Sequence, residues 1–150
     1  MKLSDYLCES GISMRLSGES KTEILTNLVN VLSNVTRIEH TEKLVTALEE
    51  REKLRTTAIG SNIAIPHCKS PDIDKLYIVI GISKTGIDFE SLDNEPVNFF
   101  FLLTAPEQSG SEHLKASAKI VRLMRKDHNR QRLIELRSPK EVIDYIKAND

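Results

Sequence analysis

The sequence predicts a single α/β domain over residues 1–150, in which α-helices cover both faces of a mixed β-sheet. Two long apolar segments lack the polar alternation of a half-exposed strand, which is typical of strands covered on both faces. Four other segments carry helix-start signals or helical spacing of apolar residues. The chain contains no linker or repeat, and its length suffices to bury one core.

Two helices are predicted in the N-terminal third of the chain. Ser20 and Glu23 form a capping box, and apolar residues at helical spacing follow it as far as about Asn34. A second helix begins after Thr41 and ends in the charged run at residues 49–53. We interpret this run as a solvated helix end, where basic side chains complement the helix dipole.

The interior strands are predicted at residues 76–82 and 97–103, which are rich in β-branched and aromatic side chains. Shorter strands are expected at residues 12–16 and 63–65. Asp93-Asn94 marks a turn between the two long strands.

Two further helices are predicted in the C-terminal third. One begins near Ser111 and carries apolar side chains at helical spacing. The other has the clearest start signal in the chain, because Ser138 can cap it, Pro139 suits its first position and Glu141 completes a capping box.

Charge and composition exclude several classes of function. The chain has 21 Lys and Arg against 22 Asp and Glu, so it lacks the basic surplus of a general nucleic-acid binder. No apolar run approaches the ~20 residues that a membrane span needs, and the first residues do not form a signal peptide. Two distant cysteines suit a reducing compartment, so we expect a cytoplasmic protein.

The sequence gives no indication of a metal or cofactor site. It lacks the Cys-x-x-Cys and His-x-x-x-His spacings of zinc sites, and we interpret Cys68 as chemically uninvolved. Walker loops, dinucleotide-binding glycine fingerprints and nucleophile elbows are also absent from the sequence.

The most unusual stretch is residues 56–67, in which small side chains, hydroxyls and a glycine precede a short apolar strand, Pro66 and His67. Small residues let backbone amides approach a ligand closely, and hydroxyls add donors, which suits an anion. Pro66 restricts the backbone on both sides, so His67 would leave the strand end in a defined direction. The local pattern alone also allows an ordinary, exposed His67.

The other histidines divide into one candidate and two surface residues. His113 opens the helix after the second long strand, where it can donate to a neighbouring anion or be a partly buried helix-start residue. His40 and His128 lie in polar surroundings and are expected to be solvated.

These residues resemble the active-site signature of phosphotransferase-system IIA domains of the fructose/mannitol/nitrogen-regulatory class. The likeness covers nearly the whole chain, with its motifs in the expected order. Its blocks are Arg51-Glu52-Lys53-Leu54, Thr57, Gly60, Ile63-Ala64-Ile65-Pro66-His67, Gly86-Ile87-Asp88-Phe89, Leu92-Asp93-Asn94-Glu95-Pro96-Val97, Ala105-Pro106-Glu107 and Glu112-His113-Leu114.

The resemblance implies that His67 takes a phosphoryl group from an HPr-type phosphocarrier protein and passes it on. It implies that His113 is the second histidine of the site, that Arg51 is the basic residue near the phosphate and that Thr57 is the hydroxyl residue of the same loop. Phosphoryl transfer mainly requires positioning and stabilisation of charge on the oxygens. No metal or cofactor is implied, because donor and acceptor are protein histidines or thiols.

The chain departs from the family pattern at three positions. Ala58 and Asn62 stand where glycine is common, and Ser117 stands where an aliphatic residue is common. Asn adopts left-handed backbone more readily than Ala does, so the substitution at residue 62 is the easier to accommodate.

Three functions remain open on this resemblance. The 150 residues contain no IIB or membrane IIC segment, which favours a nitrogen-regulatory-like IIA that acts on target proteins. The alternative is a sugar-specific IIA that passes phosphate to a separate IIB, and the segments at residues 99–101 and 105–107 look at least as fructose-like. An interaction module with an inactive site is disfavoured, because His67, His113 and Arg51 are all present.

Overall fold

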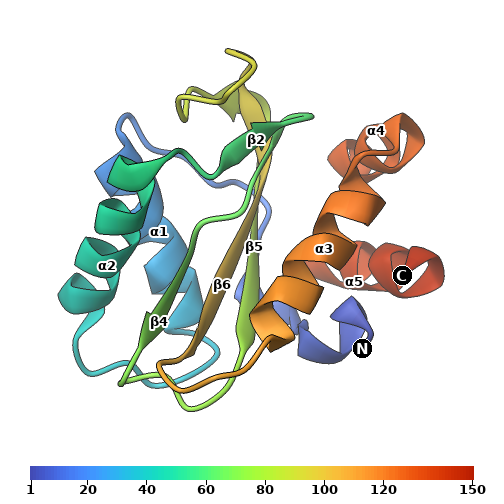
Figure 1. Ribbon diagram of the computed structural model, residues 1–150. Helices are drawn as coiled ribbons and strands as arrows, with labels where there is room; N and C mark the ends of the chain where they lie inside the picture. The colour runs from blue at the N-terminus through green and yellow to red at the C-terminus, as the bar shows by residue number, and fades with distance from the viewer.

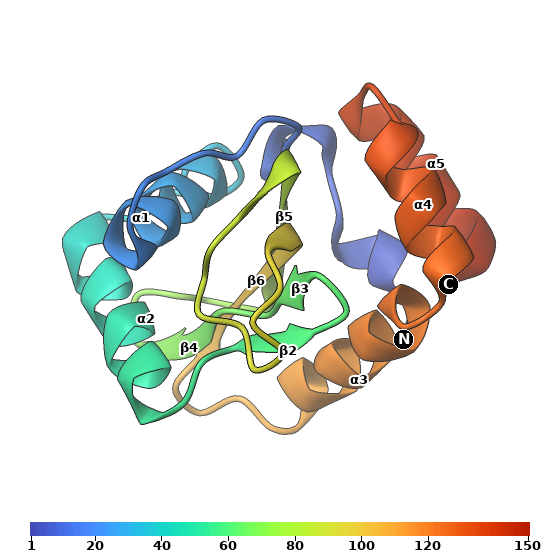
Figure 2. The same ribbon diagram turned by 90° about the horizontal axis from the view of Figure 1, so that it is seen from above.

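The computed structural model describes residues 1–150 and shows a six-stranded mixed sheet between two layers of helices (Figure 1). One face is covered by α1 (Lys21–Leu32) and α2 (Thr41–Leu54). The other is covered by α3 (Glu112–Met124), α4 (Asp127–Glu135), α5 (Pro139–Asn149) and the 3-10 turn η1 (Leu3–Tyr6), while a second turn, η2 (Glu9–Gly11), precedes the first strand. Seen from above, the two layers lie on opposite sides of the strands (Figure 2). The predicted fold class is confirmed.

The sheet is mixed because three strand pairs are parallel and two are antiparallel. Its order is β1-β5-β6-β3-β2, and β4 also pairs with β6. The pairs β5/β6 and β2/β3 are antiparallel, whereas β1/β5, β3/β6 and β4/β6 are parallel. The strands are β1 (Ile12–Ser13), β2 (Ala58–Gly60), β3 (Ile63–Ala64), β4 (His67–Ser70), β5 (Tyr77–Ile87) and β6 (Val97–Pro106).

Strand β6 shows why the long strands lack polar alternation. Phe99, Phe101 and Leu103 point into the core beneath α3 and α5, and Phe100 and Leu102 point into the core beneath α1 and α2. All five are at most 3% exposed. Since successive side chains of a strand point to opposite faces, a strand covered twice must be apolar at every position. The prediction of two buried strands is therefore confirmed.

The helix-start signals are also confirmed. The Ser20 hydroxyl accepts a hydrogen bond from the Glu23 amide at 3.1 Å, and the Ser138 hydroxyl accepts one from the Glu141 amide at 3.2 Å. Each cap satisfies an amide that has no partner within its helix. α2 begins at Thr41 itself, with His40 as the preceding residue.

Several elements lie outside the predictions. α4 was not predicted, because only Asn129 and Leu133 are buried on it and its polar sequence has no apolar periodicity. β2 lies within the unusual stretch at residues 56–67, where only the strand at residues 63–65 was predicted, and β4 begins at the last residue of that stretch, His67. β1 ends at Ser13 rather than near residue 16, while β5 and β6 run further than predicted, to Ile87 and Pro106.

The topology brings His67 to the edge of the sheet. β3 and β4 both pair with β6, and Ile65 and Pro66 separate these two strands. The carbonyl oxygen of Pro66 accepts a hydrogen bond from the Leu103 amide at 2.9 Å. β4 pairs with β6 alone, and it lies between α2 and α3 (Figure 1). Side chains on β4 can therefore reach α2, and His67 of this strand shares a pocket with His113 of α3.

No helix of this structure combines the length and the apolar character that crossing a bilayer would require.

Candidate active site

The imidazole of His67 is held by two hydrogen bonds, in which one ring nitrogen donates and the other accepts. Nδ1 lies 2.8 Å from the carbonyl oxygen of Ile65, and Arg51 Nε lies 3.3 Å from Nε2. A carbonyl can only accept and a guanidinium can only donate, so the proton of the neutral ring belongs on Nδ1. The lone pair therefore lies on Nε2. His67 is partly exposed and lines a pocket, so a reactant can approach the ring.

Arg51 reaches His67 from the last turn of α2. Its Nη1 donates to the carbonyl oxygen of Arg55 at 2.8 Å, just after the helix ends. Two hydrogen bonds at different nitrogens fix the plane of the guanidinium. The structure thus brings together His67 and the arginine that the sequence singled out.

His113 shares a pocket with both residues. This pocket has a volume of about 520 Å³, and its lining includes His67, Arg51, His113 and Lys69. Nδ1 of His113 is buried and has no hydrogen-bond partner. Burial, followed by the positive charges of Lys69 and His67, lowers the pKa of His113 below its ordinary value. A neutral His113 is thus favoured while the pocket contains no anion.

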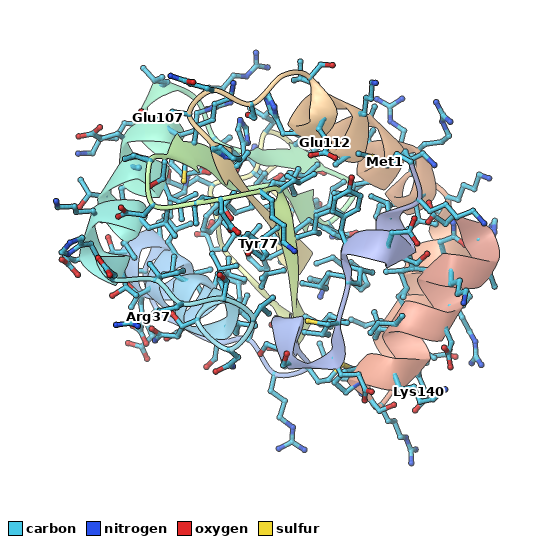
Figure 3. All side chains as sticks on the ribbon, turned by 90° about the horizontal axis from the view of Figure 1, so that it is seen from below. Met1, Arg37, Tyr77, Glu107, Glu112 and Lys140 are labelled. Atoms are coloured by element: carbon cyan, nitrogen blue, oxygen red, sulfur yellow. The ribbon has the colours of Figure 1, made fainter.

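The head of α3 is held by the N-terminal segment. The segment between Glu107 and Glu112 leads from the end of β6 to this helix (Figure 3). The Tyr6 hydroxyl donates to the carboxylate of Glu112, and this contact raises the pKa of Tyr6. Since Glu112 immediately precedes His113, the contact helps to set the position of the second histidine.

Thr57 lies near His67, but its donors are directed elsewhere. It lines a second pocket of about 340 Å³ together with Arg51 and His67. Its amide donates to Glu52 Oε1 at 3.0 Å, and its hydroxyl donates to Glu52 Oε2. In this conformation neither donor points to His67.

Glu52 corrects the prediction that the charged run at the end of α2 is wholly solvated. It is only 7% exposed, because Thr57 covers its carboxylate and Lys21 Nζ lies 3.2 Å from Oε1. Sequence reasoning did not single out Glu52 as a site residue. The available signal was its place directly after Arg51 in the family motif.

The departures from the family pattern fit the backbone. Asn62 is left-handed, with φ of 62°, and Ser61 before it has φ of 56°. Ala58 belongs to strand β2 and needs no left-handed conformation. Ser117 lines the second pocket with His67, which makes that wall more polar.

Of the remaining cysteines and histidines, only Cys68 lines the pocket of His67. Burial raises the pKa of the Cys68 thiol to about 12, so this thiol does not ionise readily. Cys8 and Cys68 are both free. His40 and His128 are exposed, as predicted. No group of three or more His, Cys, Asp and Glu side chains is arranged to hold a metal ion.

Exposed apolar side chains gather around the two pockets. Leu54 is 82% exposed at the rim of the first pocket, and Ile59 and Leu92 line the second. Leu114, which follows His113 on α3, is also exposed. We call Leu54, Ile59 and Leu92, which border the two pockets, the apolar rim. Exposed apolar residues around a site are typical of a surface that binds another protein.

Comparisons with known proteins identify the family of the chain. Residues 5–149 match the family described as "Phosphoenolpyruvate-dependent sugar phosphotransferase system, EIIA 2". A nitrogen regulatory protein of Bradyrhizobium diazoefficiens is 39% identical over 83% of this chain and 81% of its own length. The fructose-specific EIIABC component of Bacillus subtilis is 31% identical over 100% of this chain, which spans only 24% of that protein.

Two solved structures share the fold. The nitrogen regulatory protein IIA-Ntr of Neisseria meningitidis superimposes with a TM-score of 0.87 and 24% identity, over 96% of this chain and 98% of that one. The mannitol IIA of Escherichia coli, solved in complex with phosphorylated mannitol IIB, gives a TM-score of 0.79 and 20% identity over 96% and 98% of the two chains.

Proposed function

Because the chain belongs to the EIIA 2 family of the phosphoenolpyruvate-dependent sugar phosphotransferase system, and is a phosphocarrier of that system, we propose that His67 accepts and releases the phosphoryl group. The observation that carries this proposal is the unprotonated Nε2, whose lone pair faces the Arg51 side chain. Nδ1 is committed to the carbonyl of Ile65, and Arg51 is the only hydrogen-bond partner of Nε2.

The transfer is a displacement at phosphorus. The donor is the phosphohistidine of an HPr-type phosphocarrier protein. A bond forms between Nε2 of His67 and phosphorus while the bond from phosphorus to the donor nitrogen breaks, and the donor nitrogen keeps that electron pair. Nδ1 of His67 keeps its proton, so the ring that forms the new bond needs no base. In onward transfer a nucleophile of the acceptor replaces His67 in the same way.

Arg51, His113 and Lys69 are suited to stabilise the charge on the phosphoryl oxygens. Arg51 turns its donors from the Nε2 lone pair to the oxygens once phosphorus occupies that position. His113 lines the same pocket, and its unpaired nitrogen is unfavourable until a partner arrives. Lys69 adds a positive charge to the pocket. Thr57, whose donors are held by Glu52, contributes by shaping its loop.

The apolar rim is suited to dock the phosphocarrier. Two proteins that exchange a phosphoryl group must bring their nucleophiles together along one line and then separate. Exposed apolar side chains beside His67 give such a contact apolar area to bury, and a few side chains do not hold the partner permanently. The cytoplasm, where phosphoenolpyruvate is available, is the compartment that fits this role.

For the output of the phosphocarrier, we favour a nitrogen-regulatory-like IIA acting on target proteins. The supporting observation is the 39% identity to the Bradyrhizobium protein over most of both chains. The alternative is a sugar-specific IIA, which the fructose-specific relative supports. In that case the acceptor is a IIB protein, as in the mannitol complex from Escherichia coli.

The central test is labelling from phosphoenolpyruvate. Wild-type protein incubated with radiolabelled phosphoenolpyruvate, enzyme I and HPr should acquire one acid-labile, base-stable phosphoryl group. The H67A variant should acquire none, whereas H128A, a matched control in an exposed helix, should label like wild type. Undiminished labelling of H67A would overturn the assignment.

A second experiment separates the two outputs. Labelled protein is mixed with a purified fructose- or mannitol-type IIB from the same genome, and transfer is followed on a gel. Rapid transfer to IIB supports the sugar relay. Retention of label, together with phosphorylation-dependent binding to a defined regulatory target in H67A and H67D pull-downs, supports the regulatory output.

A further inference from the structure

Glu52 lies where α1, α2 and the loop after α2 meet. Its Oε1 accepts from Lys21 Nζ at 3.2 Å and from the Thr57 amide at 3.0 Å, and its Oε2 accepts from the Thr57 hydroxyl. The Glu52 side chain is 4% exposed. A buried carboxylate that accepts three hydrogen bonds, one of them from an ammonium group, is held rigidly.

The loop that Glu52 holds carries the second anchor of Arg51. The carbonyl of Arg55, two residues before Thr57, accepts from Arg51 Nη1 at 2.8 Å. The other donor of that guanidinium reaches His67 Nε2. The position of the guanidinium therefore depends on where the loop places the carbonyl of Arg55.

Lys21 links the same point to the rim of the site. Its ammonium group also lies 3.4 Å from Glu90 Oε2 and 4.7 Å from the centre of the Phe89 ring. The Thr56 hydroxyl donates to the carbonyl of Phe89 at 3.2 Å. The segment at residues 89–92, which ends in the rim residue Leu92, is thus fixed against the loop after α2.

We propose that Glu52, paired with Lys21, is a positioning residue for phosphoryl transfer, which sets the Arg51 guanidinium against Nε2 of His67 through Thr57 and the carbonyl of Arg55. This proposal rests on the proposed function, because it assigns Glu52 a role in the same reaction. Glu52 touches no reacting atom. Its effect passes through Arg51, and this dependence separates the proposal from a purely structural role.

The first test compares E52Q with E49Q. Glu49 also lies on α2 and accepts from the Thr22 hydroxyl of α1 at 2.8 Å, but it makes no hydrogen bond to the loop that holds Thr57. E52Q keeps the shape of the side chain and loses its charge. Displacement of a reacting group by about 1 Å costs up to about 100-fold in rate, so we expect E52Q to slow phosphorylation by HPr about 10- to 100-fold. E49Q should match wild type, and equal rates for E52Q and wild type would overturn the proposal.

The second test repeats E52Q in an R51A background. If Glu52 acts through Arg51, its replacement should change the transfer rate less than twofold once Arg51 is absent. A full 10- to 100-fold further loss in the double variant would assign Glu52 an independent role and overturn the proposal. Thermal melting of all four proteins measures the structural cost separately.

The third test works on unphosphorylated protein. In ¹⁵N NMR spectra, E52Q should shift the Arg51 Nε–H signal and the Nε2 signal of His67, whereas E49Q should leave both in place. Unchanged signals in E52Q would overturn the proposal. Because this measurement needs no phosphoryl donor, a wild-type protein that fails to label would refute the proposed function alone.

If E52Q does not fold, the variants T57V and T57S are used in the same kinetic and NMR tests. Valine keeps the shape of threonine but removes the hydroxyl that donates to Glu52, and serine keeps the hydroxyl. We expect T57V to slow transfer at least fivefold and to shift the Arg51 signal, and T57S, which keeps the donor to Glu52, to be affected less than T57V in both measurements. Equal behaviour of T57V and wild type would overturn the proposal.

Discussion

Arg51 Nε lies 3.3 Å from His67 Nε2, and it is the hydrogen-bond donor that faces the nitrogen on which the new bond would form. The opposite side of the ring is held by the carbonyl of Ile65 at 2.8 Å. The ring is thus oriented before any partner binds. The Arg51 guanidinium therefore stands beside the nitrogen that attacks phosphorus, where its donors can turn to the phosphoryl oxygens as charge develops on them.

This contact predicts the tautomer and the phosphorylated nitrogen of His67. In ¹⁵N NMR spectra recorded where the His67 ring is neutral, Nδ1 should give the signal of a protonated nitrogen and Nε2 that of an unprotonated nitrogen. After labelling, one-bond coupling to phosphorus should appear at Nε2. Coupling at Nδ1 would contradict the tautomer that we derive from the Ile65 and Arg51 contacts.

Replacement of Arg51 should slow phosphoryl transfer while leaving the fold intact. R51A removes a fixed donor to the developing charge, and loss of one such donor typically costs about 100-fold in rate. R51K keeps the charge but lacks the planar fork that contacts His67 and Arg55 together, so we expect an intermediate rate. Single-turnover kinetics with phosphorylated HPr measure these rates. K53A, a loss of charge on an exposed side chain two residues away, should match wild type.

The sequence alone predicts the architecture well because local signals and burial agree. Strand β6 is apolar at nearly every position since both of its faces are covered, and the two capped helices begin where their serines stand. α4 was missed because only two of its residues are buried. In such a helix tertiary packing, rather than an amphipathic pattern, selects the structure.

The site was predictable as a set of residue types but not as a network. Local chemistry and the family resemblance together pointed to His67, Arg51 and His113, which line one pocket. Glu52 was interpreted as solvated because its neighbours in sequence are charged, and its burial depends on Lys21, 31 residues away in the chain. Partners brought together by the fold leave no pattern within a single segment.

Phosphorylation of His67 should raise the pKa of His113. In the free protein, burial and the positive charges of Lys69 and His67 lower this pKa below its ordinary value of 6.5. A phosphoryl group adds about −1.5 to −2 charges to the same pocket and therefore favours the imidazolium form. NMR titration of the histidine ring protons, assigned with an H113Q variant, measures both states. The His128 titration serves as control. An unchanged pKa of His113 after phosphorylation would show that His113 does not lie next to the phosphoryl group.

The lowered pKa of His113 also fixes how stability depends on pH. A histidine whose pKa is lower in the folded state than in the unfolded state binds more protons when unfolded. The free energy of unfolding is therefore not reduced by His113 above pH 6.5. As the pH falls below that value, protonation of His113 in the unfolded state lowers the free energy of unfolding. Denaturant unfolding from pH 7.5 to 5.0 should show this decrease in wild type. The slope should be smaller in H113Q, and an identical slope would contradict the lowered pKa.

Leu54 allows the docking role of the apolar rim to be tested apart from stability. Its side chain is 82% exposed and lines the pocket of His67. L54E places a charge where we expect an apolar contact, so the apparent KM for phosphorylated HPr should rise about tenfold or more with little change in the maximal rate. The free energy of unfolding should change by about 0.5 kcal/mol or less, as for other exposed positions.

In contrast, L28A removes a fully buried side chain of α1 and should lower the free energy of unfolding by about 2–5 kcal/mol. In its folded fraction L28A should keep the KM of wild type, because Leu28 is fully buried in the core beneath α1 and α2 and lines neither pocket. An unaltered KM in L54E would show that the phosphocarrier docks elsewhere.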